Sequence, residues 1–314
     1  MSQNISSMGP RTKLYNLARK VNNFFFDEMK KKSCVPFFCD QVQVGLISPE
    51  VLEQLSRYPG VFQLTDHSVQ FNPKLDNPAK RNEALEKMLL EMKSENLFLS
   101  LKGWRSECYV TRRHFSSEMM FKMERSATPL FGVRQFGVHI TGYVHHSTRG
   151  LCVWYQRRSK TKQTWPGMLD SFVGGGITEG IGVMETAIKE AGEEANVPPE
   201  LASQLRPVGS VSFLHESDRG LHPQTEFVFD LELPESFSPS NNDGEVEDFV
   251  LTPVSDVPDT ICDDNFKTTS APIALDWLIR HGLITAESEL NYPEILELIH
   301  LPLHQMYNNN NNNS

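Results

Sequence analysis

The sequence predicts an α+β protein in which a mixed β-sheet lies between α-helices, as an α/β/α sandwich, preceded by a smaller α+β domain. Alternating apolar residues, typical of strands, recur along the chain, and two principal helical segments separate them in the C-terminal half. The texture of the chain changes near residue 129. We therefore expect an N-terminal domain at 1–128, a C-terminal domain at 129–305 and a disordered Asn-rich tail at 306–314.

The N-terminal domain is expected to combine two helices with short strands. Residues 14–26 and 82–92 carry apolar side chains at helical spacing. Between them, residues 39–48 and 60–71 alternate as strands do, and a polar turn at 66–67 divides the second segment into a hairpin.

The C-terminal domain is expected to consist of strands around two principal helices. The first helix follows a glycine-rich stretch and ends at Asn196, where a left-handed residue is expected before Pro198 and Pro199. The second helix begins at 271 and ends at 281–282. The expected strands cover residues 136–144, 150–158, 207–216, 225–234 and 244–257.

Composition limits the class of partner. The 314 residues carry a formal net charge of −10, which argues against nucleic acid because phosphate-backbone binding needs a basic surface. A small phosphorylated ligand remains compatible, since local cations or a metal ion can supply positive charge. No apolar run approaches the roughly 20 residues of a membrane span. We therefore expect a small-molecule partner, not nucleic acid or membrane, and leave the oligomeric state open.

The cysteines and the N-terminus bear on the compartment. The five cysteines are scattered and contain no CxxC pair, so neither a disulfide framework nor a zinc site is expected. This favours a reducing, cytoplasmic location. The first 26 residues hold four basic residues and no acid, which permits a mitochondrial presequence. The alternative is that this segment is the first amphipathic helix of the fold.

The segment VGGGITEGIGVMETAIKEAGEEANVP, residues 173–198, carries the main chemical signal. Glu190, Glu193 and Glu194 fall on neighbouring turns of one helix face, beside its core-facing stripe. Three like charges this close repel one another, and only Lys189 lies nearby to relieve them. A hard divalent cation, Mg²⁺ or Mn²⁺, is the natural counter-charge. The alternative is a solvated face. The expected stripe consists of Met184, Ala187, Ile188, Ala191 and Ala195.

The glycines before the helix support the prediction of a ligand site. Gly175 and Gly176 lie in a stretch whose backbone N–H groups can approach an anion closely, together with the helix N-terminus. A glycine loop, a carboxylate helix and an abrupt helix end predict a compact loop–helix–loop typical of a diphosphate site.

This segment resembles the signature of the Nudix hydrolases, and the resemblance implies the Nudix fold for the C-terminal domain. The positions aligned with the signature include Gly175, Lys189, Glu190, Glu193, Glu194 and Val197. Three positions depart from the signature: Ile181 replaces its first glutamate, Lys189 its arginine and Asn196 its last glycine. The glutamates that bind metal in the family are all retained.

A wider resemblance covers residues 14–303. Stretches such as GWRSECY and FKTTSAPIALDWLIRHGLI look like one Nudix subgroup, the thiamine-pyrophosphokinase-related proteins, which carry an extra N-terminal domain. The resemblance implies Mg²⁺-dependent hydrolysis of thiamine diphosphate or its damaged forms, such as oxy- or oxothiamine diphosphate. The products are a monophosphate and phosphate, which would make the reaction one of metabolite repair.

The resemblance also implies roles for particular residues. Glu190, Glu193 and Glu194 are assigned to the metal and to catalysis. Glu247 is the first choice for a further metal ligand or base, and the alternative is that it lies at an exposed strand end. Glu245 lies two residues away on the same strand face.

Other candidates follow from side-chain chemistry. Arg158 and Lys162 are candidates to pair with phosphate oxygens, with a basic surface loop as the alternative. Trp104 with Arg105, and Trp165, are candidates to contact an aromatic ring of the substrate, with packing as the alternative for each. The histidines show no metal-binding spacing and are given no role.

Two other functions remain open at this point. The departures at Ile181 and Lys189 permit a non-catalytic protein that binds a diphosphate without hydrolysing it. A Nudix hydrolase of a nucleoside diphosphate derivative such as ADP-ribose is the other alternative. The N-terminal domain forms either part of the pocket wall or only a surface for a partner.

Overall fold

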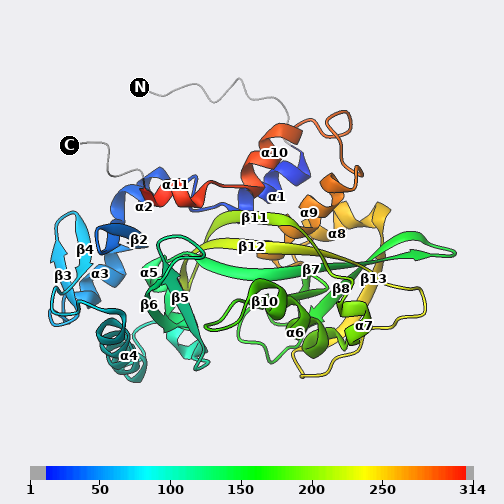
Figure 1. Ribbon diagram of the computed structural model, residues 1–314. Coiled ribbons are helices and arrows are strands. Elements are labelled where there is room, and N and C mark those ends of the chain that lie inside the picture. The colour runs from blue at the N-terminus through cyan, green and yellow to red at the C-terminus, as the bar shows by residue number, and fades with distance from the viewer. Residues whose placement is uncertain (1–11, 309–314) are drawn as a thin grey trace, which may run out of the picture.

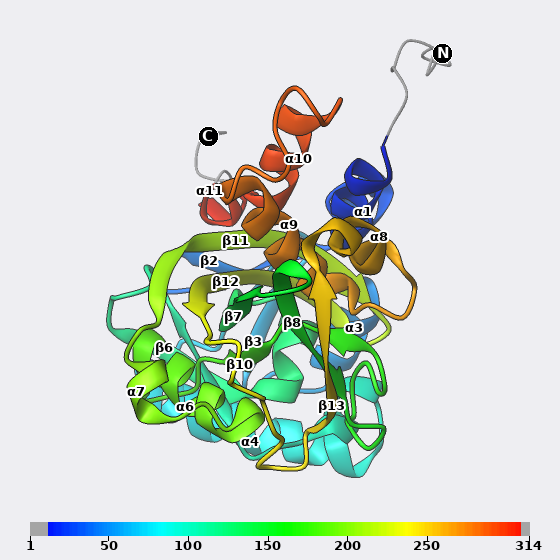
Figure 2. The same cartoon turned by 90° about the vertical axis from the view of Figure 1, so that its right-hand side faces the viewer.

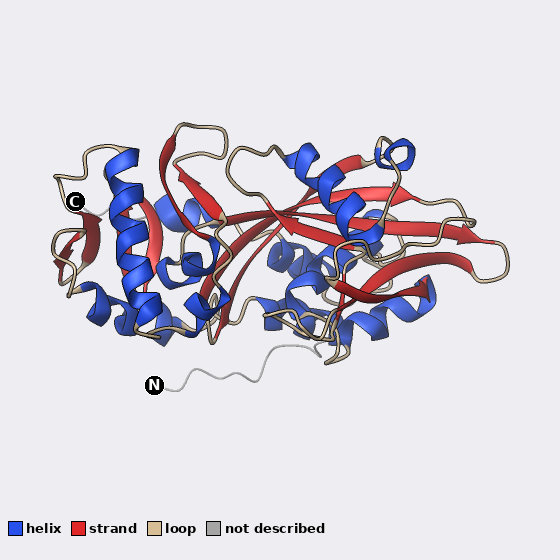
Figure 3. Ribbon diagram, turned by 90° about the horizontal axis from the view of Figure 1, so that it is seen from below, coloured by secondary structure: helices blue, strands red, loops and turns tan. Residues whose placement is uncertain are grey.

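The computed structural model describes residues 12–308, which form two units lying end to end (Figures 1 and 3). The smaller unit comes mainly from the N-terminal part of the chain and contains a four-stranded sheet of order β2-β1-β4-β3. Its strands are β1 (Val35–Cys39), β2 (Val42–Ile47), β3 (Phe62–Thr65), β4 (Ser68–Phe71), and the hairpin of β5 (Cys108–Arg112) and β6 (Met119–Glu124). Its helices are α2 (Glu28–Ser33), α3 (Pro49–Leu55), α4 (Pro78–Ser94), α5 (Thr128–Phe131) and the 3₁₀ helices η1 (Leu99–Gly103) and η2 (Arg125–Ala127).

Aromatic packing holds this smaller unit together. The ring of Phe37 on β1 lies 5.3–5.8 Å from those of Phe62, Phe71, Phe121 and Phe131, and all five are buried. The expected hairpin at 60–71 is confirmed as β3 and β4, and the expected helix at 82–92 as part of α4. Strand β1 was not expected from the sequence.

The larger unit is a seven-stranded mixed sheet of order β11-β12-β7-β8-β13, with β10 added to β7 and β9 to β8. Strands β7 and β12 are parallel and the other pairs are antiparallel. The strands are β7 (Gln135–His146), β8 (Gly150–Arg158), β9 (Leu169–Asp170), β10 (Val173–Gly176), β11 (Arg206–Ser217), β12 (Gly220–Glu232) and β13 (Val246–Pro253).

Helices cover both faces of this sheet, so the expected α/β/α sandwich is confirmed (Figure 2). Helices α6 (Val183–Ala195) and α7 (Pro199–Ala202) lie on one side. The other side carries α1 (Lys13–Val21), α8 (Val257–Cys262), α9 (Ala271–Arg280), α10 (Tyr292–Ile299) and two short 3₁₀ turns, η3 (Val254–Asp256) and η4 (Thr268–Ser270).

The two ends of the described chain cross between the units. Helix α1 packs its Leu14, Leu17 and Ala18 into the same core as Trp277 of α9, although it precedes the smaller unit in sequence. Helix α11 (Leu303–Asn308) instead packs near β2, and the Tyr307 hydroxyl donates to the Gly132 carbonyl at 2.7 Å. Each unit therefore borrows a helix from the far end of the chain.

Three sequence expectations about helices need correction. The first helix ends at Val21 rather than 26, because the buried side chain of Asn22 caps it by donating to the carbonyls of Ala18 and Leu298. The second principal helix ends at Arg280. The expected tail at 306–314 is wrong for 306–308, since α11 includes them and buries Tyr307, while 309–314 lie outside the described residues.

No helix within residues 12–308 is long and apolar enough to cross a membrane. The structure describes only part of the basic N-terminal segment, because residues 1–11, which include Arg11, lie outside the described residues. Its remaining part, α1, is the amphipathic helix that the sequence offered as the alternative to a presequence.

Candidate active site

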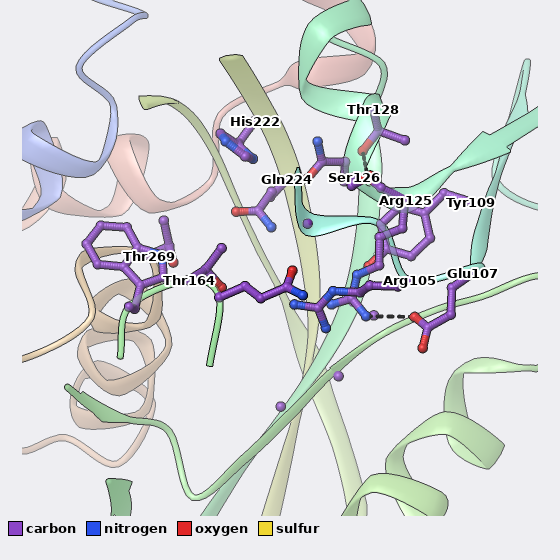
Figure 4. A pocket seen from close by; sticks show the side chains of 18 of the residues that line it. Arg105, Glu107, Tyr109, Arg125, Ser126, Thr128, Thr164, His222, Gln224 and Thr269 are labelled. Carbon is purple, nitrogen blue, oxygen red and sulfur yellow. Dashed lines mark hydrogen bonds and ion pairs between the residues drawn. The ribbon is translucent and has the colours of Figure 1, made fainter. Parts of the chain in front are cut away.

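A cavity of about 700 Å³ lies where the two units meet. The smaller unit contributes residues of η1, β5 and η2 to its wall, and the larger unit contributes β7, β10, β11, β12 and α6 (Figure 4). The N-terminal part of the chain is therefore part of the pocket wall.

Helix α6 forms one side of this cavity. Its N-cap is Gly182, whose N–H donates to the Glu185 carboxylate at 3.4 Å. Its C-cap is Asn196, whose left-handed φ of 51° confirms the expected cap. Its buried stripe is narrower than expected. Ala187, Ala191 and Ala195 are fully buried, as are Thr186 and Glu194.

Met184 and Ile188, which were expected in this stripe, are 40% and 43% exposed. The face of α6 that packs on the sheet therefore includes Glu194 and excludes Met184 and Ile188. The small alanine side chains let α6 approach β10, which brings the Glu194 carboxylate against the β10 backbone. The position of the sheet, which the sequence does not reveal, decides which face is buried.

The glycine run is a strand and not the expected loop. Gly174, Gly175 and Gly176 pair with His139, Val138 and Gly137 of β7. A Cβ atom at Gly175 would overlap the Glu190 side chain, and one at Gly176 would overlap the Tyr109 hydroxyl. The glycines therefore make room for side chains from α6 and from the smaller unit, and residues 177–182 connect this strand to α6.

The three helix carboxylates lie in different environments. The buried Glu194 accepts hydrogen bonds from the Gly174 N–H at 2.9 Å and the Gln156 side chain at 3.0 Å, and burial raises its pKa to about 7. Glu190 lines the cavity and is 17% exposed, and burial raises its pKa. Glu193 also lines the cavity but is 46% exposed.

Lys189, which stands where the signature has arginine, neutralises part of this charge. Its ammonium lies 2.7 Å from Glu193 and 3.5 Å from Glu190. In this arrangement, no three acidic, histidine or cysteine side chains among residues 12–308 converge closely enough to hold a metal ion. Glu190 and Glu193 supply carboxylate oxygens at the cavity wall, which is the donor type that Mg²⁺ and Mn²⁺ prefer.

Glu247, the first choice for a further ligand or base, does not line the cavity. Its carboxylate pairs with the exposed Lys160 at 3.3 Å. The β8–β13 register shifts between Val246 and Asp248, so Glu247 occupies a bulge that sequence alternation does not anticipate. Glu245 does line the cavity and forms an ion pair with Lys162.

Glu226 on β12 is the carboxylate that sequence reasoning missed. It is 6% exposed, lines the cavity and packs where a side chain at Gly137 would stand. Its carboxylate lies 4.0 Å from Nε2 of His139 and has no hydrogen bond within the described chain. Burial raises its pKa to about 7. The available signal was an acid inside the alternating apolar strand TEFVFDLEL.

The expected phosphate-binding cations both line the cavity. Arg158 is largely buried and donates to Asp170 at 2.8 Å and to the Thr164 carbonyl. Burial alone would raise the pKa of Asp170, but the charges of Lys267 and Arg158 hold it well below its usual range. Burial lowers the pKa of Lys162 to about 8, and the neighbouring Arg158 contributes to the shift.

The aromatic candidates separate. Trp104 lies outside the cavity lining and packs on the core of the smaller unit, with the Lys93 ammonium 4.7 Å from its ring. Arg105 and Trp165 do line the cavity. The histidines, which were given no role, include His139 in the wall, where burial lowers its pKa to about 3 and keeps the ring neutral.

Comparison with known proteins follows this division of the chain. A family model described as "NUDIX domain" matches residues 136–271, and one described as "Domain of unknown function (DUF4743)" matches residues 13–135. Nudix hydrolase 20, chloroplastic, of Arabidopsis thaliana is 34% identical over 279 residues, which are 86% of this chain and 74% of that protein. Nudix hydrolase 24, chloroplastic, of the same plant is 34% identical over 257 residues, which are 81% and 69%.

Among solved structures, the Nudix domain of Shewanella oneidensis NrtR complexed with ADP-ribose matches 49% of this chain and 91% of that chain. The identity is 18% and the TM-score is 0.37.

The two plant relatives bear on the compartment. Because both are named as chloroplastic, the expectation of a cytoplasmic location is wrong.

Proposed function

Because this chain belongs to the Nudix hydrolase family and is a pyrophosphatase-type hydrolase, we propose that it cleaves the diphosphate of thiamine diphosphate or of its damaged oxy- and oxothiamine forms. The observation that carries the proposal is the cavity in which the carboxylates of α6 meet cations from both units. The thiamine part rests on the sequence resemblance along residues 14–303. The products are the monophosphate and phosphate.

Glu190 and Glu193 are the residues that would hold Mg²⁺ or Mn²⁺, and the bound ion would neutralise charge on the phosphoryl oxygens. Glu194 is a positioning residue for this pair, since its carboxylate accepts a hydrogen bond from the Gly174 N–H and so fixes α6 against β10. Lys189 must release Glu193 when an ion binds, because both compete for the same carboxylate.

Glu226 replaces Glu247 as the proposed general base. It is buried in the cavity wall without a hydrogen-bond partner in the described chain, so its carboxylate is available to a water molecule beside the diphosphate. A base whose pKa is near neutrality accepts a proton efficiently at physiological pH. Lys162 and Arg158 face the same cavity and would stabilise negative charge on the leaving phosphate.

A substrate panel tests this proposal. Purified protein with Mg²⁺ or Mn²⁺ is given thiamine diphosphate, oxothiamine diphosphate and ADP-ribose, and phosphate and monophosphate products are measured. We expect phosphate release from the thiamine compounds, with the highest kcat/KM for a damaged form. Turnover of ADP-ribose alone would reject the thiamine assignment in favour of a nucleoside diphosphate derivative.

We also propose an organellar location, supported by the chloroplastic names of the two relatives. The full-length chain with a C-terminal fluorescent fusion should accumulate in an organelle of its native host cell. Diffuse cytosolic fluorescence would contradict this location.

A further inference from the structure

The smaller unit contains a buried carboxylate that ties together two of its cavity-facing segments. Glu124, at the end of β6, is 5% exposed. Its Oε1 accepts from the Arg105 N–H at 3.0 Å and from the Ser126 N–H at 3.2 Å. Since Arg105 and Ser126 come from separate segments of the chain, this shared acceptor fixes both against the same cavity wall.

A second carboxylate holds a cation in the same place. The Glu107 side chain accepts from Arg125 at 3.0 Å, and its main-chain carbonyl accepts from the Arg125 N–H at 2.8 Å. The Arg125 guanidinium lies 5.3 Å from the centre of the Tyr109 ring. Its charge also reaches Glu190 of α6, whose pKa it lowers against the larger opposing effect of burial. The smaller unit thus directs a fixed cation toward the carboxylate helix.

Arg105 differs from Arg125 because its guanidinium has no carboxylate within ion-pairing distance in the described chain, whereas Arg125 pairs with Glu107. Within residues 12–308, its side chain has neither a hydrogen bond nor an ion pair, although it is partly buried and lines the cavity (Figure 4). Burial lowers its pKa and the neighbouring Arg125 lowers it further, while the charge of Glu107 opposes them. Withdrawing an unpaired charge from water is costly, so the arrangement is stabilised when an anion enters.

Unused hydroxyl groups belong to the same cavity wall. The Oγ atoms of Ser100 and Ser126 are buried and have no hydrogen-bond partner in the described structure. Ser100 is 2% exposed, and its helix η1 packs against η2, which carries Ser126. Both residues line the cavity. A guanidinium with two hydroxyl donors is a suitable set for the oxygens of a phosphate group.

We propose that the smaller unit supplies an oxyanion subsite, formed by Arg105, Ser100 and Ser126, which binds a phosphate group of the substrate at the cavity wall that the smaller unit forms. This inference rests on the proposed function, because it assigns the subsite to the same diphosphate. It gives the N-terminal part of the chain a direct role in binding substrate. The α6 carboxylates would then bind the metal ion that contacts the diphosphate, and Arg105 would bind a phosphate group of the same diphosphate directly.

Direct binding tests the subsite separately from hydrolysis. Methylenediphosphonate, a diphosphate analogue that cannot be hydrolysed, is titrated into the full-length protein by calorimetry in EDTA, so that no metal assists. The wild-type protein should bind it with a measurable Kd, and Arg105→Met should weaken binding at least tenfold. Arg105→Lys should recover part of the affinity, and Ser126→Ala should lose about threefold, the value of one ordinary hydrogen bond.

Arg113→Met is the matched control. Arg113 lies in the same unit, is exposed and does not line the cavity, so its loss removes the same charge without touching the subsite. Its Kd should equal that of the wild type. Thermal unfolding of each variant checks that the fold is intact, and Ser126→Ala remains informative should Arg105→Met unfold.

Two results would overturn the subsite: wild-type protein that does not bind the analogue at millimolar concentration, or Arg105→Met that binds it as tightly as Arg113→Met. Binding that depends on Arg105 in a protein without turnover would reject the proposed reaction and keep the subsite. Turnover by the wild type together with an unchanged Kd in Arg105→Met would keep the proposed reaction and reject the subsite.

Discussion

Depth decides what each carboxylate of the cavity does. Glu193 reaches solvent, Glu190 lies at the cavity wall and Glu194 is buried against β10, although all three come from five consecutive residues. Glu226 reaches the same wall from a different strand. Side chains of identical chemistry thereby acquire separate tasks, because burial changes the cost of their negative charge.

The exposed pair on α6 leads to a prediction about metal affinity. Lys189→Met removes the ammonium that occupies Glu193 and Glu190, so Mn²⁺ should bind more tightly, by about threefold to tenfold. Calorimetric titration measures the change. Lys160→Met is the control, because Lys160 pairs with Glu247 outside the cavity. Equal Mn²⁺ affinity in the wild type and Lys189→Met would show that these carboxylates do not bind the ion.

Glu226 leads to a prediction about pH. Its pKa is about 7 in the folded protein and near 4.5 when unfolded, so the folded state binds its proton more tightly. This contribution to stability is complete below about pH 4.5 and is lost as the pH rises through 7. Between pH 5 and pH 8 the free energy of unfolding should fall by up to about 3 kcal/mol less in Glu226→Gln than in the wild type.

Urea unfolding at the two pH values measures this difference. Glu226→Gln should also lower kcat by at least a hundredfold while KM changes little, since the proposed base acts on water. Full activity in this variant would contradict its role. Glu247→Gln, altered at the exposed bulge, should keep wild-type kcat.

The packing of β10 against α6 shows how a short strand can set a site. Three consecutive glycines are needed because side chains from α6, from the smaller unit and from β7 occupy the space where their Cβ atoms would stand. The strand pairing fixes the backbone, so a larger residue has no room to move away.

Glycine substitutions test this at two positions. Gly175→Ala should displace the Glu190 carboxylate, lower kcat at least tenfold and destabilise the protein by about 1–3 kcal/mol. Gly192→Ala is the control on α6 itself, because a Cβ there meets no atom within 4 Å. It should raise the free energy of unfolding by about 0.5–1 kcal/mol through helix propensity. Calorimetric unfolding and steady-state kinetics measure both effects.

At the scale of the whole molecule, the exchange of terminal helices joins the two units. Helix α1 belongs to the core beneath α9, and α11 returns to the smaller unit. The cavity lies between the same two units, so its geometry depends on their staying together.

Unfolding should therefore be a single cooperative transition for the full chain. Leu17→Ala, in the core that α1 shares with α9, should destabilise the protein by about 2–3 kcal/mol and lower the melting temperature of both units together. Tryptophan fluorescence and circular dichroism should report the same midpoint. Two separated transitions would show that the units fold independently.

Local patterns in the chain were enough to identify the principal strands, the acidic helix and its left-handed end at Asn196, because these depend on neighbours within a few residues. The order of strands and helices along the chain indicated the sandwich. Position in three dimensions decided the remainder. The buried face of α6, the bulge that turns Glu247 away, the burial of Glu226 and the arrival of Arg105 at the cavity all depend on segments distant in sequence. A side chain's periodicity shows which face it occupies, but only the packed neighbours determine what lies opposite that face.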